Sequence, residues 1–140
     1  MEDVMTTDQK RTGSSTTYKF EYGLPGFENL SEFEFINLDE FQPFKLFRSV
    51  AMPEISMIVL DGNLLKVYDN VSFPKHEMKI LGLENLKYLR TFVILRIEEK
   101  TKHFVANTKA PLILNTYSGF GKQIILDDPN LSEEFKLDNF

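Results

Sequence analysis

Side chains suited to acid–base or nucleophilic chemistry are sparse in this sequence. It contains two histidines, His76 and His103, and no cysteine. The lack of cysteine excludes thiolate nucleophiles, disulfides and cysteine-ligated zinc. No nucleophile motif accompanies either histidine, so we expect both on the surface or on an edge strand. We therefore predict no enzyme activity, no catalytic residue, no metal site and no cofactor.

A glycine-rich segment, "SGFGKQ" at residues 118–123, could offer backbone amides and the Lys122 ammonium to a phosphate group. A Walker-type phosphate loop needs a glycine where Thr116 stands and a serine or threonine where Gln123 stands. The segment therefore predicts a glycine-rich hairpin turn rather than a nucleotide site.

Paired carboxylates occur at Glu98-Glu99, Asp127-Asp128 and Glu133-Glu134. The side chains of adjacent strand residues point to opposite faces, so none of these pairs forms a local carboxylate dyad. We interpret them as solvated strand ends.

The formal net charge of −5 repels phosphate backbones, so direct nucleic-acid binding is not expected. The same charge favours encounter with a basic protein partner. The sequence shows neither the apolar run of a secretory signal nor 18 consecutive apolar residues. We predict a cytoplasmic protein without membrane contact.

Alternating apolar and polar residues predict a series of short strands. In "YKFEY", for example, Tyr18, Phe20 and Tyr22 alternate with Lys19 and Glu21. The other predicted strands cover residues 32–38, 43–50, 55–61, 64–71, 89–99, 102–108, 111–117 and 122–128.

Turn and helix signals separate these strands. "GLPGFENL" at residues 23–30 predicts a turn, and Asp61-Gly62-Asn63 predicts a hairpin that returns through residues 64–71. One short helix is predicted, with Ser72 as its cap and Gly82 after its end.

The elements together predict a mainly β fold. We expect a small antiparallel β-barrel-like single domain with one short helix, covering residues 17–140. The polar residues 1–16 predict a mobile N-terminal arm.

The segment "ANTKAPLILN" at residues 106–115 predicts a short core strand with polar ends. Pro111 cannot donate to a sheet and suits the strand start, and residues 112–114 are apolar. Asn107 and Asn115 can satisfy backbone groups where strand pairing stops.

This segment, followed by "GKQIIL", is similar to the C-terminal signature of the flagellar assembly factor FliW family. "FEYGLPGFENLSEFEF", and "PFKLFRSV" followed by "ISMIVLDG", resemble further family segments in the same order, so the resemblance covers roughly residues 18–127. We assign a structural role to the positions that match the family motifs: Gly23, Pro25, Gly26, Asn107, Pro111, Asn115, Gly121 and Gln123.

The resemblance implies a protein that binds cytoplasmic flagellin as a chaperone and also binds CsrA, a small RNA-binding translational repressor. Binding of the repressor would relieve repression of flagellin translation when flagellin is scarce. We assign repressor contacts to Asp69 and Glu77, in a polar connection, and flagellin contacts to Ile125, Leu112 and Phe120, near the glycine turn.

Two other interpretations stay open. A β-barrel enzyme or small-ligand module would place its site in the barrel mouth and would need converging polar groups there. A purely structural export chaperone would bind flagellin without touching the repressor.

Overall fold

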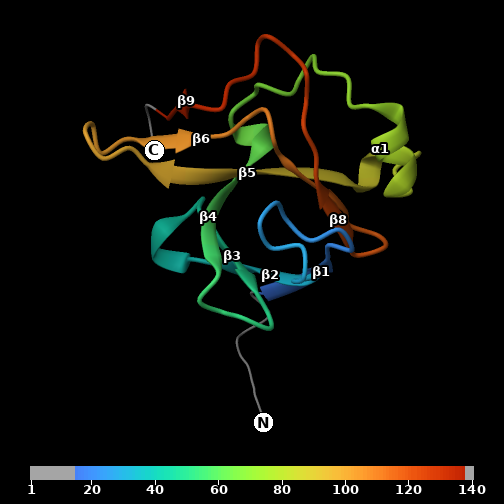
Figure 1. Ribbon diagram of the computed structural model, residues 1–140. Helices are drawn as coiled ribbons and strands as arrows, with labels where there is room; N and C mark the ends of the chain where they lie inside the picture. Colours follow the sequence, from blue (N-terminus) through green and yellow to red (C-terminus); the bar gives the residue numbers. More distant parts are fainter. Residues whose placement is uncertain (1–14, 138–140) are drawn as a thin grey trace.

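Nine strands, one α-helix and three short 3-10 helices form within residues 15–137, the part of the chain that the computed structural model describes (Figure 1). The strands are β1 Ser15–Lys19, β2 Glu32–Asn37, β3 Lys45–Ser49, β4 Ser56–Asp61, β5 Leu89–Ile97, β6 Phe104–Ala106, β7 Leu112–Asn115, β8 Phe120–Gln123 and β9 Phe135–Lys136. The helices are η1 Asp39–Phe41, η2 Gly62–Leu64, α1 Lys75–Ile80 and η3 Leu86–Tyr88.

Seven of the strands close into a barrel. They follow the order β4-β3-β2-β1-β8-β7-β5, and pairing between β5 and β4 completes the ring. Neighbours in the ring are antiparallel except β1 and β8, which run parallel with Lys19 opposite Phe120. The predicted β-barrel with one short helix is confirmed, and the parallel pair is a feature that the prediction lacked.

Phenylalanine fills the barrel interior. The inward positions of β2 and β3 place the rings of Phe33 and Phe47 in a stack with centroids 4.7 Å apart. Phe20 packs edge-on against both rings, and all three side chains are fully buried. A chain without tryptophan or cysteine thus builds its core from aromatic pairs, which add to the stabilisation from buried area.

A second apolar core lies on the outer side of β5 and β7. Val93 and Ile113 point into it, while Phe92 and Leu112, their neighbours in sequence, point into the barrel. The α1 region and the chain that follows β8 cover this second core (Figure 1). Both faces of β7 and of the middle of β5 are therefore buried.

Tyr68 and Thr108 hold this cover in place. The Tyr68 hydroxyl donates a 2.6 Å hydrogen bond to the Thr108 carbonyl, and burial raises the pKa of the Tyr68 phenol. The Thr108 hydroxyl donates to the Ser132 carbonyl at 2.9 Å and accepts from the Ser132 N–H at 2.8 Å. These bonds tie the connection that contains Tyr68 and the segment that contains Ser132 to the segment between β6 and β7.

The predicted turn after β1 is confirmed. Gly23 and Gly26 have φ of +64° and +87°, in the left-handed region that favours glycine. A Cβ at Gly23 would lie 2.6 Å from the Glu28 Cα, so this position also has no room for a side chain.

The predicted hairpin at Asp61-Gly62-Asn63 is wrong. The Asp61 carboxylate accepts a 2.9 Å bond from the Asn63 N–H and starts η2 instead. Lys66 then adopts a φ of +59°, which a strand does not accommodate, and no strand forms over residues 64–71. Strand β4 pairs with β5 instead.

Helix α1 starts and ends by backbone geometry. Pro74, not Ser72, occupies the N-cap position, and no side chain caps the helix there, so the predicted Ser72 cap is wrong. At the other end Gly82 has a φ of +67°. The N–H groups of Gly82 and Leu83 bond the carbonyls of Lys79 and Met78 at 3.0 and 2.8 Å, a Schellman motif that confirms the predicted end.

Strand β1 differs from its prediction at both ends. It includes Ser15 and Thr16, which we had placed in the mobile arm, and the rest of that predicted arm lies outside the described residues. It ends at Lys19, so Tyr22 does not continue the alternation and is exposed.

Candidate functional site

A surface groove of about 360 Å³ lies where α1 ends, beside the β7–β8 turn and the residues that follow β1. Three of its apolar side chains face solvent, with Tyr22, Ile80 and Tyr117 exposed to 58%, 49% and 80%. We call it the Tyr22–Tyr117 groove. Its lining residues are Glu21, Tyr22, Ile80, Leu81, Gly82, Asn115, Tyr117, Ser118, Phe120 and Gly121.

Asn115 holds two walls of the groove together. Its side-chain Nδ2 donates to the Leu81 carbonyl at 2.8 Å, at the end of α1. Its Oδ1 accepts from the N–H groups of Tyr117 and Ser118 at 2.9 and 3.1 Å, in the β7–β8 turn. Because Asn115 is itself buried, one side chain fixes the helix end relative to the turn.

Gly121 gives the groove its floor. A Cβ added at Gly121 would lie 2.7 Å from the Phe20 ring and 2.8 Å from Leu114 Cδ2. Strand β8 can therefore lie this close to the barrel core only if residue 121 is glycine. Phe120 is half-buried and lines the groove beside Gly121. The structural role that we assigned to Gly121 thus has a steric basis.

An ion pair lies beside the groove. The Lys122 ammonium pairs with the Glu77 carboxylate and also lies 5.0 Å from the centroid of the Tyr22 ring. On the other side, the rings of Tyr88 and Tyr117 lie 5.2 Å apart. Glu77, which we had assigned to the repressor, is therefore engaged by Lys122 beside the groove.

The three residues that we had assigned to flagellin fall in different places. Phe120 lines the groove. Ile125 is 70% exposed but is not among the groove's lining residues. Leu112 is 0% exposed, so its assignment to an outer surface is wrong, because β7 turns this side chain into the barrel core.

Asp69 lies apart from the groove. It is exposed in the connection between η2 and α1 and does not line the groove. The structure therefore does not bring Asp69 into one pocket with Phe120, and its contact with the repressor stays a prediction.

The other motif residues support the backbone around β7. The Asn107 Oδ1 accepts from the Lys109 N–H at 3.1 Å, and the Gln123 Nε2 donates to the Ala110 carbonyl at 3.0 Å. Pro111 is buried just before β7 begins. These contacts satisfy backbone groups at the strand ends, as the sequence of this segment suggested.

Sequence reasoning missed the two tyrosines of the groove, Tyr22 and Tyr117. The alternation in "YKFEY" placed Tyr22 on the inner face of a strand, and Tyr117 was read only as part of the strand over residues 111–117. A signal was present in the turn residues around Tyr117, since a tyrosine in a glycine-containing turn is exposed unless the fold covers it.

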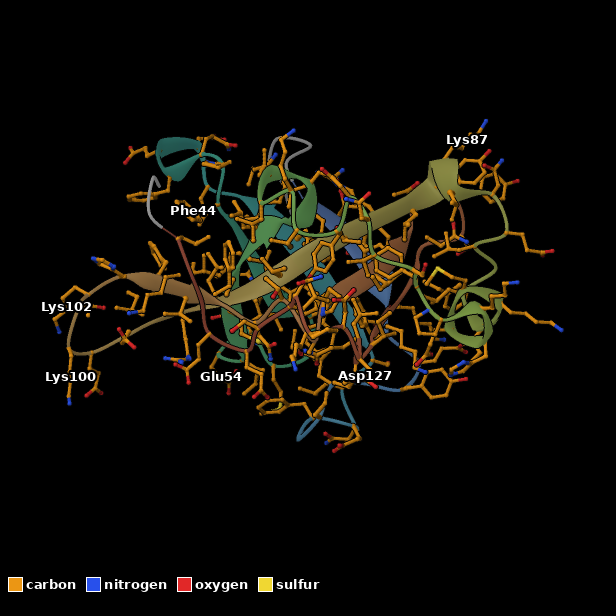
Figure 2. The ribbon with its side chains drawn as sticks, turned by 90° about the horizontal axis from the view of Figure 1, so that it is seen from above. Phe44, Glu54, Lys87, Lys100, Lys102 and Asp127 are labelled. Atoms are coloured by element: carbon orange, nitrogen blue, oxygen red, sulfur yellow. The ribbon has the colours of Figure 1, made fainter. Side chains whose placement is uncertain are left out.

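Basic side chains gather at the two ends of β5. Figure 2 shows Lys100 and Lys102 on the β5–β6 loop and Lys87 beside the opposite end of the strand. Glu54 and Asp127 project from other connections.

Across residues 15–137, no helix is both long and apolar enough to cross a bilayer.

Comparison with known proteins decides the family. The model of the FliW protein family matches residues 4–137. The chain belongs to the FliW family. A protein of Caldanaerobacter subterraneus called flagellar assembly factor FliW is 38% identical over 110 residues, which are 78% of this chain and 73% of that protein.

Further FliW relatives agree. The flagellar assembly factor FliW of Bacillus velezensis is 33% identical over 109 residues, covering 78% of this chain and 76% of that protein. A crystal structure of the flagellar assembly factor FliW shares the fold with a TM-score of 0.75 at 22% identity, over 89% of this chain and 88% of that one. The expected family is confirmed, and with it the β-barrel architecture.

Proposed function

We propose that this FliW chain is a cytoplasmic flagellar assembly factor that works by contact, without catalysis or a cofactor. It binds unassembled flagellin as a chaperone and binds the CsrA repressor when flagellin is scarce. Repression of flagellin translation is relieved in that state and returns when flagellin occupies the protein.

The Tyr22–Tyr117 groove is the observation that carries the flagellin half of the proposal. Unassembled flagellin ends in amphipathic helices with unpaired apolar stripes, and such a helix binds a groove with exposed apolar walls. Tyr22, Ile80 and Tyr117 supply these walls, and the Asn115 hydrogen bonds hold them in place before binding. A preformed groove lowers the entropy cost of association.

Charge supports the repressor half. A protein that binds RNA exposes basic side chains, and a chain with a net charge of −5 is complementary to such a surface. Asp69 is exposed on a loop, where a carboxylate can reach a partner without opening the fold.

Mutual exclusion of the two partners gives the coupling its size. If bound flagellin prevents repressor binding, the apparent affinity for the repressor falls by the factor 1 + [flagellin]/Kd. Each tenfold change in free flagellin above its Kd is then equivalent to about 1.4 kcal/mol.

The substitution Tyr117→Ala tests the groove. We expect flagellin binding, measured by calorimetry with the purified full chain, to weaken at least about tenfold, as for an aromatic anchor at an interface. Far-ultraviolet circular dichroism of the variant should match the wild type, because Tyr117 is 80% exposed.

Ile97→Ala is the matched control. Ile97 is also an exposed apolar residue, and it lies at the end of β5. Tyr117 lies near the opposite end of this strand, because it is two residues beyond Asn115, which pairs with Leu89 at the start of β5. The two sites are separated by roughly 25 Å of strand. Equal weakening in both variants, or unchanged binding in Tyr117→Ala, would remove the groove from the proposal.

A further inference from the structure

A second cavity, of about 200 Å³, opens at one end of the barrel. Strands β1, β3 and β5 begin there and β2 and β7 end there, so five strands contribute side chains to one mouth. Its lining residues are Thr16, Tyr18, Phe35, Asn37, Lys45, Arg90, Phe92 and Leu114. None of them lines the Tyr22–Tyr117 groove.

Two cations meet in this mouth. The Lys45 ammonium donates to the Oδ1 atom of Asn37, which is a neutral partner. The Arg90 guanidinium lies 3.3 Å from the Asp61 carboxylate and stacks over the Phe92 ring at 4.8 Å. Among residues 15–137, one carboxylate, that of Asp61, therefore acts on these two cations, and this part of the barrel mouth is locally positive in a protein whose net charge is −5.

The charge of Arg90 reaches across the cavity. Burial, and then the charge of Arg90, lowers the pKa of the Lys45 ammonium, while Asp61 opposes this shift. Burial raises the pKa of the Tyr18 phenol, and Arg90 counteracts this. An anion bound between Lys45 and Arg90 would relieve the repulsion between their charges.

Among residues 15–137, no carboxylate lines the cavity. Asp39 and Glu40 follow β2 in the chain, but both are exposed to solvent. Arg90 and Asp61 are the charged groups that shift the pKa of Lys45, and neither Asp39 nor Glu40 is among them.

The floor of the cavity favours retention of a charge-assisted contact. Phe35, Phe92 and Leu114 are buried core residues beneath the two cations, while the Arg90 side chain is partly exposed to solvent. Hydrogen bonds from cations to an oxyanion are about twice as strong as neutral ones, and a low dielectric strengthens them further. The volume of about 200 Å³ is large enough for a small anion.

We propose that the barrel mouth binds a small oxyanion, a phosphate or carboxylate group, between Lys45 and Arg90. The hydroxyls of Thr16 and Tyr18 and the amide of Asn37 line the same cavity and supply neutral donors to the remaining oxygens. This site shares no lining residue with the Tyr22–Tyr117 groove, so the anion proposal does not depend on the flagellin proposal.

Binding of inorganic phosphate to the full chain tests the site. Calorimetry should detect phosphate binding beyond that of potassium chloride at matched ionic strength, and acetate in a parallel titration shows whether carboxylates also enter. Lys45→Met should weaken binding at least about tenfold. Lys100→Met, which removes an exposed lysine from the β5–β6 loop (Figure 2), should change it less than about twofold.

A measurement on the unmodified chain guards against a variant that fails to fold. The pKa of Lys45, followed by NMR of its side-chain methylene next to the ammonium, should rise when phosphate is added and should not rise when potassium chloride is added at matched ionic strength. Phosphate binding no stronger than chloride binding, equal losses in the two variants, or a Lys45 pKa that ignores phosphate would each overturn the proposal.

Discussion

The Asn115 side chain donates to the Leu81 carbonyl at 2.8 Å across 34 residues of sequence. The same amide accepts two N–H groups from the β7–β8 turn. A polar residue at the end of a core strand thus serves a surface feature, because it fixes the end of α1 against the turn that carries Tyr117. In the FliW signature, Asn115 therefore holds the groove in shape and is not proposed to contact a partner.

Replacing Asn115 by alanine should therefore affect both stability and binding. The Leu81 carbonyl loses its side-chain donor and two turn amides lose their acceptor, so we expect the free energy of unfolding to fall by about 2 kcal/mol. Flagellin binding should weaken in parallel because the groove loses its fixed shape. Urea denaturation and calorimetry measure the two effects.

Asn107→Ala serves as the comparison for Asn115→Ala. Asn107 is half-buried and its side chain accepts a bond from the Lys109 N–H, outside the groove. It should cost less stability and leave flagellin affinity unchanged. If both variants lose flagellin affinity equally, the specific role of Asn115 is refuted.

Replacement by valine should have opposite effects on stability at Thr91 and at Thr108. The Thr91 hydroxyl is buried without a hydrogen-bond partner among residues 15–137, so Thr91→Val removes an unsatisfied group and should stabilise the fold by about 1 kcal/mol. Thr108→Val breaks two bonds with Ser132 and should destabilise it by about 2 kcal/mol. Urea midpoints of the two variants on either side of the wild type are expected; a shift in the same direction would contradict this account.

Reversal of charge at Asp69 tests the repressor contact. Asp69→Lys should weaken CsrA binding at least about fivefold and leave flagellin binding intact, because Asp69 is outside the groove. Glu54→Lys makes the same change of net charge in the exposed β3–β4 connection (Figure 2) and should have a smaller effect. Surface plasmon resonance at two salt concentrations compares the CsrA affinities of the two variants. Equal losses of affinity would show that net charge, and not a specific contact of Asp69, governs repressor binding.

The pH dependence of stability has one local source in Glu98. The hydrogen bond from the Thr101 hydroxyl lowers the pKa of the Glu98 carboxyl below 4.5, with smaller help from Lys136 and Arg96. A lowered pKa in the folded state contributes stability that is present above pH 4.5 and is lost as the pH falls through the folded-state pKa. Carboxyl NMR titration should show the Glu98 pKa rising in Thr101→Val, whereas Thr116→Val should leave it unchanged.

Most of the barrel was predictable from sequence because most of its strands carry a local signal. Strand β8 is the exception, because Phe120–Gln123 lies within the segment that was predicted to be a glycine-rich turn. The alternation around Phe33 and Phe35 and the apolar run before Asn115 indicate strands locally, and the glycines of the first turn indicate where the chain reverses. The failure at residues 64–71 arose because the same alternation there is overridden by the turn at Lys66 and by the pairing of β4 with β5.

The groove and the barrel mouth were not predictable in the same way. Tyr22 and Tyr117 become neighbours of one groove only through the parallel pairing of β1 and β8, and Lys45 meets Arg90 only when the ring closes. Such juxtapositions depend on long-range topology, and a single sequence carries no local signal for them.

The parallel pairing of β1 and β8 also constrains how the protein is made. Its two strands are about 100 residues apart in sequence, so a growing chain cannot seal its phenylalanine interior until β8 has left the ribosome. During that interval the aromatic rings of β2 and β3 are open to other chains. A protein proposed to cover the exposed apolar surface of unassembled flagellin therefore exposes apolar surface of its own while it is being synthesised.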